Sequence, residues 1–218
     1  MRTRPVAGGG QAVEVEPERL AGWFHRFALR HGGVLRTVIT SGSVRVESAD
    51  RTTATATVPF GQLTAAAHTG LVIDPLVAHV LVARRIGLLL VRLGGHSVGI
   101  AVDGRIEVSR TERHLLHARS SAGGWSQRRF ARRREGQARH ALASAATDAA
   151  AILVPQLSTL DAVVLGGDQR ALDELRPDRR LTELFTLAEP RILDVPEPRR
   201  AVLEEAARRA RSVEITVV

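Results

Sequence analysis

The chain has 218 residues, 44% of them hydrophobic, and a formal net charge of +8. This length suffices for one sizeable core with a small additional unit, and the positive charge favours a polyanionic partner such as RNA. The chain contains no cysteine, which excludes disulfides, thiolate catalysis and cysteine-based zinc fingers.

The sequence shows no signal for secretion or membrane insertion. The N-terminus lacks an apolar signal core. The longest apolar run, residues 86–93, is interrupted by Arg92 and is too short to cross a bilayer. Together with the absence of cysteine, this predicts a soluble cytoplasmic protein without a membrane partner.

Residues 1–73 are expected to form a tail and a small extension. Residues 1–15 begin with a glycine-rich stretch, and we expect a disordered tail there. Residues 17–31 carry Leu20, Trp23, Phe24 and Phe27 at helical spacing, with proline at the start and two glycines after the end, which predicts an amphipathic helix. Three short strands in a small antiparallel sheet are expected at residues 34–40, 43–47 and 52–59. Residues 16–73 are therefore predicted to be a small α+β N-terminal extension.

The pattern changes at Asp74, where Asp-Pro begins a short predicted helix. Residues 86–93 are apolar enough for a strand that is buried on both faces. Strands at residues 97–102 and 105–109 flank Asp103 and Gly104, which together are a strong signal for a hairpin turn. This part of the chain is therefore predicted to be a three-stranded meander.

A long helix is predicted from about residue 127 to residue 153, with residues 141–152 as its tightly packed apolar half. The remaining expected elements are a strand at 161–165, a helix at 169–175, a strand at 191–195, a helix at 197–211 and a strand at 213–218. A strand meander followed by alternating helices and strands predicts a mixed-sheet α/β domain over residues 74–218.

Residues 120–137 are the most unusual stretch, because a loop of small residues runs directly into an arginine-rich helix. Gly123 and Gly124 let the backbone approach another molecule closely, and Ser121 or Ser126 could cap the helix. At about 100° per residue, several arginines share one broad face opposite an apolar one. They are Arg128, Arg129, Arg132, Arg133 and Arg139. The helix is therefore predicted to have a packing side and a phosphate-binding side.

Each of these signals also has a plain structural interpretation. A Gly-Gly loop before a helix is a simple turn in most proteins, and runs of arginine are usually solvated faces. Gln127 taken alone would be an ordinary residue near a helix start. It is the occurrence of all three in fixed register that favours a functional interpretation.

The hairpin at residues 98–104, the Gly123-Gly124 loop and the Arg-Phe-Ala-Arg-Arg-Arg run at residues 129–134 together resemble the catalytic middle domain of eukaryotic and archaeal class I release factors. The tip of that domain carries Gly-Gly-Gln before a similar Arg-Phe-Ala-Arg helix. The chain is still more similar to the Vms-like release factor family, specifically its actinobacterial peptidyl-tRNA hydrolase members, whose loop reads Gly-Gly-x-Ser-Gln. The resemblance covers residues 74–218 and implies a ribonuclease H-like, mixed-sheet α/β fold.

The sequence departs from the class I pattern at one position. When the chain is aligned through Phe130, Trp125 occupies the place of the catalytic glutamine, and Gln127 follows two residues later. The resemblance to the Vms-like family assigns the catalytic role to Gln127, in a loop with Gly123, Gly124 and Ser126. Trp125 either stacks on a nucleotide base or folds back as an anchor. With Trp125, the implied RNA-binding residues are Arg128, Arg129, Arg132, Arg133 and Arg134.

The resemblance implies a codon-independent peptidyl-tRNA hydrolase that releases nascent chains from stalled ribosomes or large subunits. Its implied partners are the large subunit and peptidyl-tRNA, and we expect a monomer that uses no cofactor or metal and does not bind DNA. Residues 1–73 are too few to hold the stop-codon-reading and GTPase-partner domains of full release factors. Two alternatives remain open: an endonuclease that cuts the tRNA acceptor end, as associated with eukaryotic Vms-like relatives, and a non-catalytic ribosome- or RNA-binding protein.

Other groups of residues give weaker signals. Glu112, His114 and His117 have a spacing that a metal site could use, although a solvated or RNA-facing role is expected. The segments 94–96 and 166–168 superficially resemble phosphate loops but match no P-loop, and we interpret them as strand-end turns. Four acidic residues near predicted strand ends would make a nuclease cluster only if they converge. They are Asp103, Glu107, Asp161 and Asp168.

Overall fold

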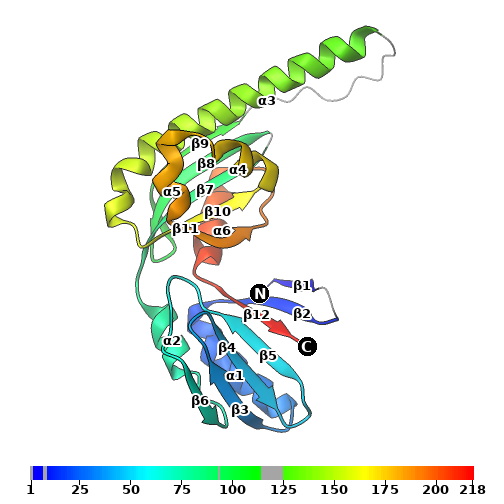
Figure 1. The fold of residues 1–218 in the computed structure, drawn as a ribbon, viewed down its shortest axis with the longest axis vertical. Coiled ribbons are helices and arrows are strands. Elements are labelled where there is room, and N and C mark those ends of the chain that lie inside the picture. The colour runs from blue at the N-terminus through cyan, green and yellow to red at the C-terminus, as the bar shows by residue number, and fades with distance from the viewer. Residues whose placement is uncertain (1, 7–8, 93, 114–124) are drawn as a thin grey trace. The chain divides into compact units, whose positions relative to one another are not determined.

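The computed structural model describes residues 2–6, 9–92, 94–113 and 125–218, and for residues 125–135 it describes the backbone alone. The chain divides into two compact units (Figure 1). The first unit consists of Met1–Ala83 and Arg211–Val218, and the second of Arg84–Ala210.

The first unit contains a seven-stranded sheet in the order β1-β2-β12-β5-β4-β3-β6. All of its neighbouring strands pair antiparallel. The strands are β1 (Thr3–Pro5), β2 (Gln11–Val15), β3 (Val34–Ile39), β4 (Ser43–Ser48), β5 (Thr53–Thr57), β6 (Ala66–Thr69) and β12 (Val213–Val217). The three strands expected between residues 34 and 59 are present and form the β5-β4-β3 part of this sheet.

Helix α1 (Pro17–Arg30) supplies the core of the first unit, as its periodicity predicts. Leu20, Phe24 and Phe27 are buried against the inward-facing residues of the sheet, and Trp23 stacks on Phe27 with ring centroids 5.7 Å apart. Helix α2 (Asp74–Leu81) adds Leu76 to the same core. The first unit therefore extends to Ala83, beyond the expected boundary at residue 73.

Both ends of the chain differ from expectation. Residues 3–5 and 11–15, expected to lie in a disordered tail, form strands β1 and β2. The C-terminal strand β12 lies between β2 and β5 rather than in the α/β unit. Ile215 faces Val13 across the ladder, and both side chains are buried. The alternation of residues 213–217 identifies a strand, but partner choice depends on contacts that are distant in sequence.

The turn between β4 and β5 is held by the carboxylate of Asp50. It accepts hydrogen bonds from Ser48 Oγ (2.7 Å) and the Thr52 amide (3.0 Å), and it pairs with His31 Nδ1 at 2.8 Å. The hydrogen bond from Ser48, with those from Thr52 and His31, holds the pKa of Asp50 well below its ordinary value. The ionised carboxylate is thus the form that the folded turn prefers.

Substitution Asp50→Asn is expected to lower the thermal midpoint of the first unit at neutral pH. Because the folded-state pKa is depressed, the carboxylate contributes stability above its unfolded pKa of about 3.9, and this contribution is lost as the pH falls through the folded pKa. The gap between wild type and variant should therefore shrink in acid. Thermal unfolding across a pH series tests this expectation, and equal midpoints at neutral pH would contradict it.

The second unit is built on a five-stranded mixed sheet in the order β11-β10-β7-β8-β9. Strands β7, β8 and β9 form the predicted antiparallel meander, and β10 runs parallel to both β7 and β11. The strands are β7 (Arg85–Arg92), β8 (Gly95–Val102), β9 (Arg105–Arg113), β10 (Ala162–Gly167) and β11 (Ala188–Leu193). Residues 86–91 are all buried, which confirms a strand covered on both faces. The mixed-sheet α/β class is therefore confirmed.

Helices cover both faces of this sheet. They are α3 (Trp125–Ile152), α4 (Gln169–Leu175), α5 (Thr182–Thr186) and α6 (Arg200–Ala210), with 3₁₀ turns at Val154–Thr159 and Arg179–Leu181. On one face, Leu142 of α3 packs in a common core with Val98 and Ile100 of β8. On the other face, a Cβ at Gly99 would lie 3.0 Å from Leu203 Cδ2 of α6. Alternate residues of β8 thus contact opposite layers.

The β8–β9 connection is the tight turn expected from Asp103 and Gly104. Their φ angles are 50° and 78°, the left-handed conformation at both central positions that a type I′ turn requires. This turn sets the register of β8 and β9, and that register decides which β9 side chains face α3.

Within the described ranges, no helix is both long and apolar enough to span a membrane.

Candidate functional site

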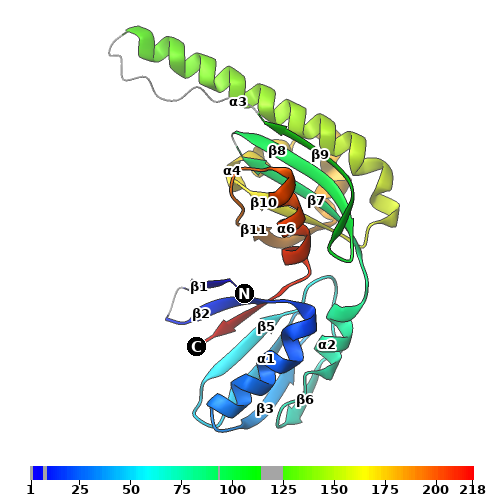
Figure 2. The ribbon, with the colours of Figure 1, turned by 180° about the vertical axis from the view of Figure 1, so that it is seen from behind.

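Helix α3 has a packed C-terminal half and an N-terminal half that extends beyond the ends of β8 and β9 (Figure 2). Among residues 136–152, whose side chains the structure describes, the buried ones all come from the segment predicted to pack. They are Ala141, Leu142, Ala145, Ala146, Asp148 and Ala149. The small alanine side chains let the helix lie close to the sheet, whereas Arg139 is exposed. The segment before residue 141 spans about 24 Å of helix at 1.5 Å per residue.

The predicted catalytic and RNA-binding residues map to the start of α3 and to the segment before it. Gly123 and Gly124 lie outside the described residues, as do His114 and His117. Trp125, Ser126 and Gln127 are the first three residues of the helix, and the arginines at 128–134 follow in the same helix. The helix starts two residues earlier than expected, so Ser126 lies inside it rather than at its cap.

Asp103, Glu107 and Asp161 lie around Arg84 and Arg85 at one end of the sheet, and Asp168 lies at the other end of β10. Among the described residues, the four acidic residues considered as a nuclease cluster do not form a group close enough to hold a metal ion. Asp161 precedes β10 and Asp168 follows it, so that they lie at opposite ends of one strand. The carboxylate of Asp161 accepts the Arg85 amide at 2.7 Å, and Glu107 pairs with the Arg85 side chain at 3.3 Å. Asp103 lies in the hairpin turn. Each therefore has a local structural role.

The segment at residues 166–168 is the end of a strand, as predicted. Gly167 has a φ of 104°, and a Cβ there would lie 2.1 Å from the Val91 carbonyl oxygen, so only glycine fits. Asp168 is the N-cap of α4, where its side chain accepts the Arg170 amide at 3.0 Å. This segment terminates β10 and starts α4.

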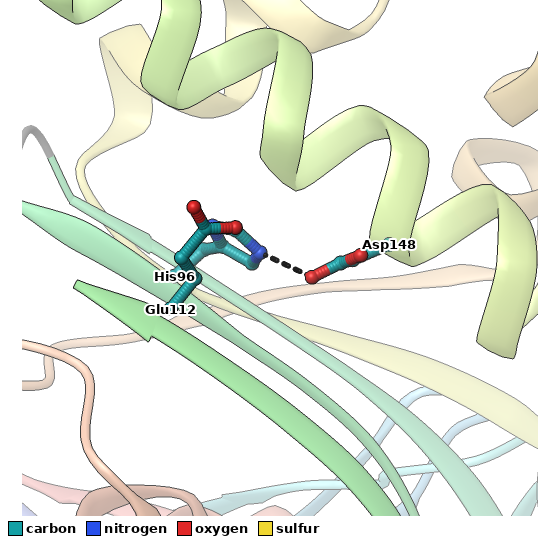
Figure 3. A group of neighbouring side chains, drawn as sticks. All are labelled: His96, Glu112 and Asp148. Carbon is teal, nitrogen blue, oxygen red and sulfur yellow. Dashed lines mark hydrogen bonds and ion pairs between the residues drawn. The ribbon is translucent and has the colours of Figure 1, made fainter. Parts of the chain in front are cut away.

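A buried polar cluster lies where α3 packs on the sheet (Figure 3). His96 from β8 is only 1% exposed, and its Nε2 lies 2.9 Å from Asp148 Oδ2 of α3. Arg110 from β9 donates to Asp148 Oδ1 at 2.8 Å. Glu112, also from β9, accepts a hydrogen bond from the Ser144 hydroxyl of α3. Potential ligand atoms of His96, Glu112 and Asp148 lie within 4.8 Å of one another.

The carboxyl group of Asp148 is ionised at neutral pH despite its burial. Desolvation by burial would raise its pKa, but the hydrogen bonds from His96 and Arg110 and the Arg110 charge outweigh that effect and lower the pKa. The Asp148 carboxylate therefore places a negative charge on the side of α3 that packs against the sheet.

The sequence alone does not associate His96, Glu112 and Asp148 with one another. The sequence pattern predicts a strand-end turn at residues 94–96, whereas the structure places His96 inside β8. Glu112 stands out in the sequence only beside His114 and His117, not beside a strand partner. The signal that could have found the cluster is Asp148, the only charged residue in the apolar segment 141–152. A lone acid on a packing face needs a buried partner.

Three comparisons relate the chain to known proteins. A search of curated proteins gave no significant match. An archaeal translation termination factor, aRF1, known from a crystal structure, is 13% identical with a TM-score of 0.46, covering 90% of this chain and 70% of that one. A second archaeal protein is 12% identical with a TM-score of 0.41, covering 88% and 69%. Both scores are too low to carry an inference about function.

The match to a family model covers more than half of the chain. The model describes the actinobacterial and chloroflexi VLRF1 release factors, and it matches residues 84–216. This range contains the whole five-stranded sheet, helix α3 and the segment with the glycine pair. The chain therefore belongs to the actinobacterial and chloroflexi VLRF1 release factor family.

Proposed function

We propose that the protein is a codon-independent peptidyl-tRNA hydrolase that releases nascent chains from stalled ribosomes or large subunits. The family gives the chain a release factor-like role in translation, and association with the ribosome follows from that role. The observation that carries the proposal is the position of Gln127 in the first turn of α3, three residues after Gly124 and at the end that extends beyond the sheet.

The proposed chemistry is hydrolysis of the ester that joins the peptide to tRNA. Gly123 and Gly124 make the segment slim enough to enter a narrow RNA-lined channel. The amide side chain of Gln127 would orient the attacking water, and a backbone N–H would donate to the developing oxyanion. This mechanism works through positioning and the RNA environment, so that it calls for no acidic or basic side chain at the tip.

Arginines in the same helix would hold RNA while the tip reaches the ester. Guanidinium groups bind phosphate oxygens through two parallel hydrogen bonds, and residues 128–134 contain five arginines, namely Arg128, Arg129, Arg132, Arg133 and Arg134. Trp125, the first residue of α3, is proposed to stack on a base. The tip would thus combine RNA binding with water positioning in a single helical segment.

The products distinguish this function from its two rivals. With a large subunit that carries labelled peptidyl-tRNA, ester hydrolysis yields free peptide and a full-length tRNA with its 3′ end intact. A tRNA shortened at the 3′ end would instead support an acceptor-end endonuclease. Binding without either product would support a non-catalytic RNA-binding protein and would overturn the proposal. Release by puromycin serves as the control that the complex is competent.

A further inference from the structure

We propose that His96, Glu112 and Asp148 bind one divalent transition-metal ion, of the Zn²⁺ or Mn²⁺ type, where α3 packs on β8 and β9. These residues offer one imidazole nitrogen and two carboxylates from three separate elements. Neither the family description nor the proposed hydrolysis assigns a metal to this position. The inference is therefore independent of the proposed function.

The backbone brings the three ligands together. His96 and Glu112 are direct partners in the β8–β9 ladder, so their side chains lie on the same face of the sheet at neighbouring positions. Asp148 reaches the same point from α3 (Figure 3). For metal–ligand bonds near 2.1 Å, neighbouring ligand atoms lie about 3.0 Å apart in an octahedral site and about 3.4 Å apart in a tetrahedral one. His96 Nε2 and Asp148 Oδ2, now 2.9 Å apart in a hydrogen bond, would therefore separate by about 0.5 Å or less to bind the same ion. A metal ion would replace the proton that these two atoms share.

Each carboxylate is also held by a second residue. Arg110 donates to Asp148 Oδ1 while Oδ2 faces His96, and the Ser144 hydroxyl donates to Glu112. Proteins orient metal-binding carboxylates in this way, through outer hydrogen bonds to the ligands. The Arg110 side chain is 61% exposed, so that its charge stays largely solvated and opposes a nearby cation only weakly.

The donor set selects the class of ion. Two carboxylates balance the charge of a divalent cation, and an imidazole nitrogen favours Zn²⁺, Fe²⁺ or Mn²⁺ over Mg²⁺ and Ca²⁺, which prefer oxygen ligands. Within one site, affinity should follow the order Zn²⁺ above Mn²⁺. Burial of His96 and Asp148 excludes most of the competing water from these two ligands.

The ion would act as a structural cross-link. Gln127 lies about 30 Å from Asp148 along the helix axis at 1.5 Å per residue, so the metal cannot touch the substrate at the proposed tip. It would join β8, β9 and α3 at the level where the helix leaves the sheet. Metal occupancy would thereby fix the direction in which α3 extends.

The experiment titrates the full chain, free of any histidine tag and stripped with a chelator, with Zn²⁺, Mn²⁺ and Mg²⁺ in separate runs. We expect one Zn²⁺ bound per chain, weaker binding of Mn²⁺ seen as loss of the free-ion EPR signal, and no saturable binding of Mg²⁺. Zn²⁺ should also raise the thermal midpoint, because it binds the folded state alone. Peptide release is not part of the readout, so failure of the proposed function would leave this test unaffected.

Three variants locate the site. Glu112→Gln retains the size of a partly exposed side chain, and it should abolish stoichiometric binding without preventing folding. Ser144→Ala removes only the outer hydrogen bond and should weaken binding about 10- to 100-fold. His25→Gln changes an exposed histidine of α1 and should have no effect. Absence of bound Zn²⁺ in wild type, or unchanged binding by Glu112→Gln, would overturn the proposal.

Discussion

Replacement of Gln127 by alanine is expected to reduce peptide release from a peptidyl-tRNA–large-subunit complex by about 100- to 1,000-fold, the usual cost of losing one preorganised group at a developing charge. Binding to the large subunit should stay unchanged, because the arginines of α3 remain. Alanine is a better helix former than glutamine, so that the first turn of α3 should persist. Single-turnover release of labelled peptide measures the rate constant, and sedimentation with large subunits measures binding.

Gln137→Ala is the matched control for this experiment. Gln137 lies on the same helix and is half-buried, and the same atoms are removed in a region far from the proposed tip. It should release peptide at the wild-type rate. Full release by Gln127→Ala would exclude the proposed role of that residue, whereas equal losses in both variants would indicate a general effect on α3.

Much of the second unit could be predicted because its signals are local. The apolar run at residues 86–91 identifies a doubly covered strand, and Asp103 with Gly104 defines a hairpin turn through their backbone preferences alone. The spacing of small residues between Ala141 and Ala149 shows which half of α3 packs. Each of these predictions needs only a few neighbouring residues.

The features that could not be predicted depend on partners far away in sequence. Strand β12 pairs with β2 and β5, although nearly two hundred residues lie between β2 and β12. Alternation reports that a strand has an inner face but not which sheet it joins. Similarly, nothing near His96 in the sequence indicates that Asp148 lies beside it. The candidate metal site is therefore a product of the tertiary structure.

The proposed catalytic role of Gln127, unlike the candidate metal site, depends on residues that are neighbours in the sequence. The proposed role of Gln127 and its neighbours rests on one continuous stretch of sequence, with no tertiary information needed. The structure adds that this stretch begins a helix whose far half is anchored in a core. The proposed function therefore requires two separable properties: the chemistry of the tip, and the firm packing of residues 141–149.

Substitution Ala145→Glu is expected to destabilise the second unit by about 3–5 kcal/mol, which is the cost of an uncompensated buried charge. Ala145 is 0% exposed and lies in the core between α3 and the sheet. The free energy of unfolding of a domain of this size is only about 5–15 kcal/mol. This single change would therefore remove a large part of it. Peptide release should fall with it even though every residue of the tip is intact.

Ala143→Glu provides the control, because Ala143 lies two residues away on the exposed side of the same helix. It adds the same charge to α3 without burying it and should change stability by less than about 0.5 kcal/mol. Hydrogen exchange read separately in α3, β8 and the first-unit strands would show whether the loss is confined to the second unit. Equal protection of α3 in the two variants would mean that the helix does not depend on this packing. Faster exchange of α3 and slower peptide release in Ala145→Glu, with wild-type values of both in Ala143→Glu, would establish that activity at the tip depends on the anchored half of α3.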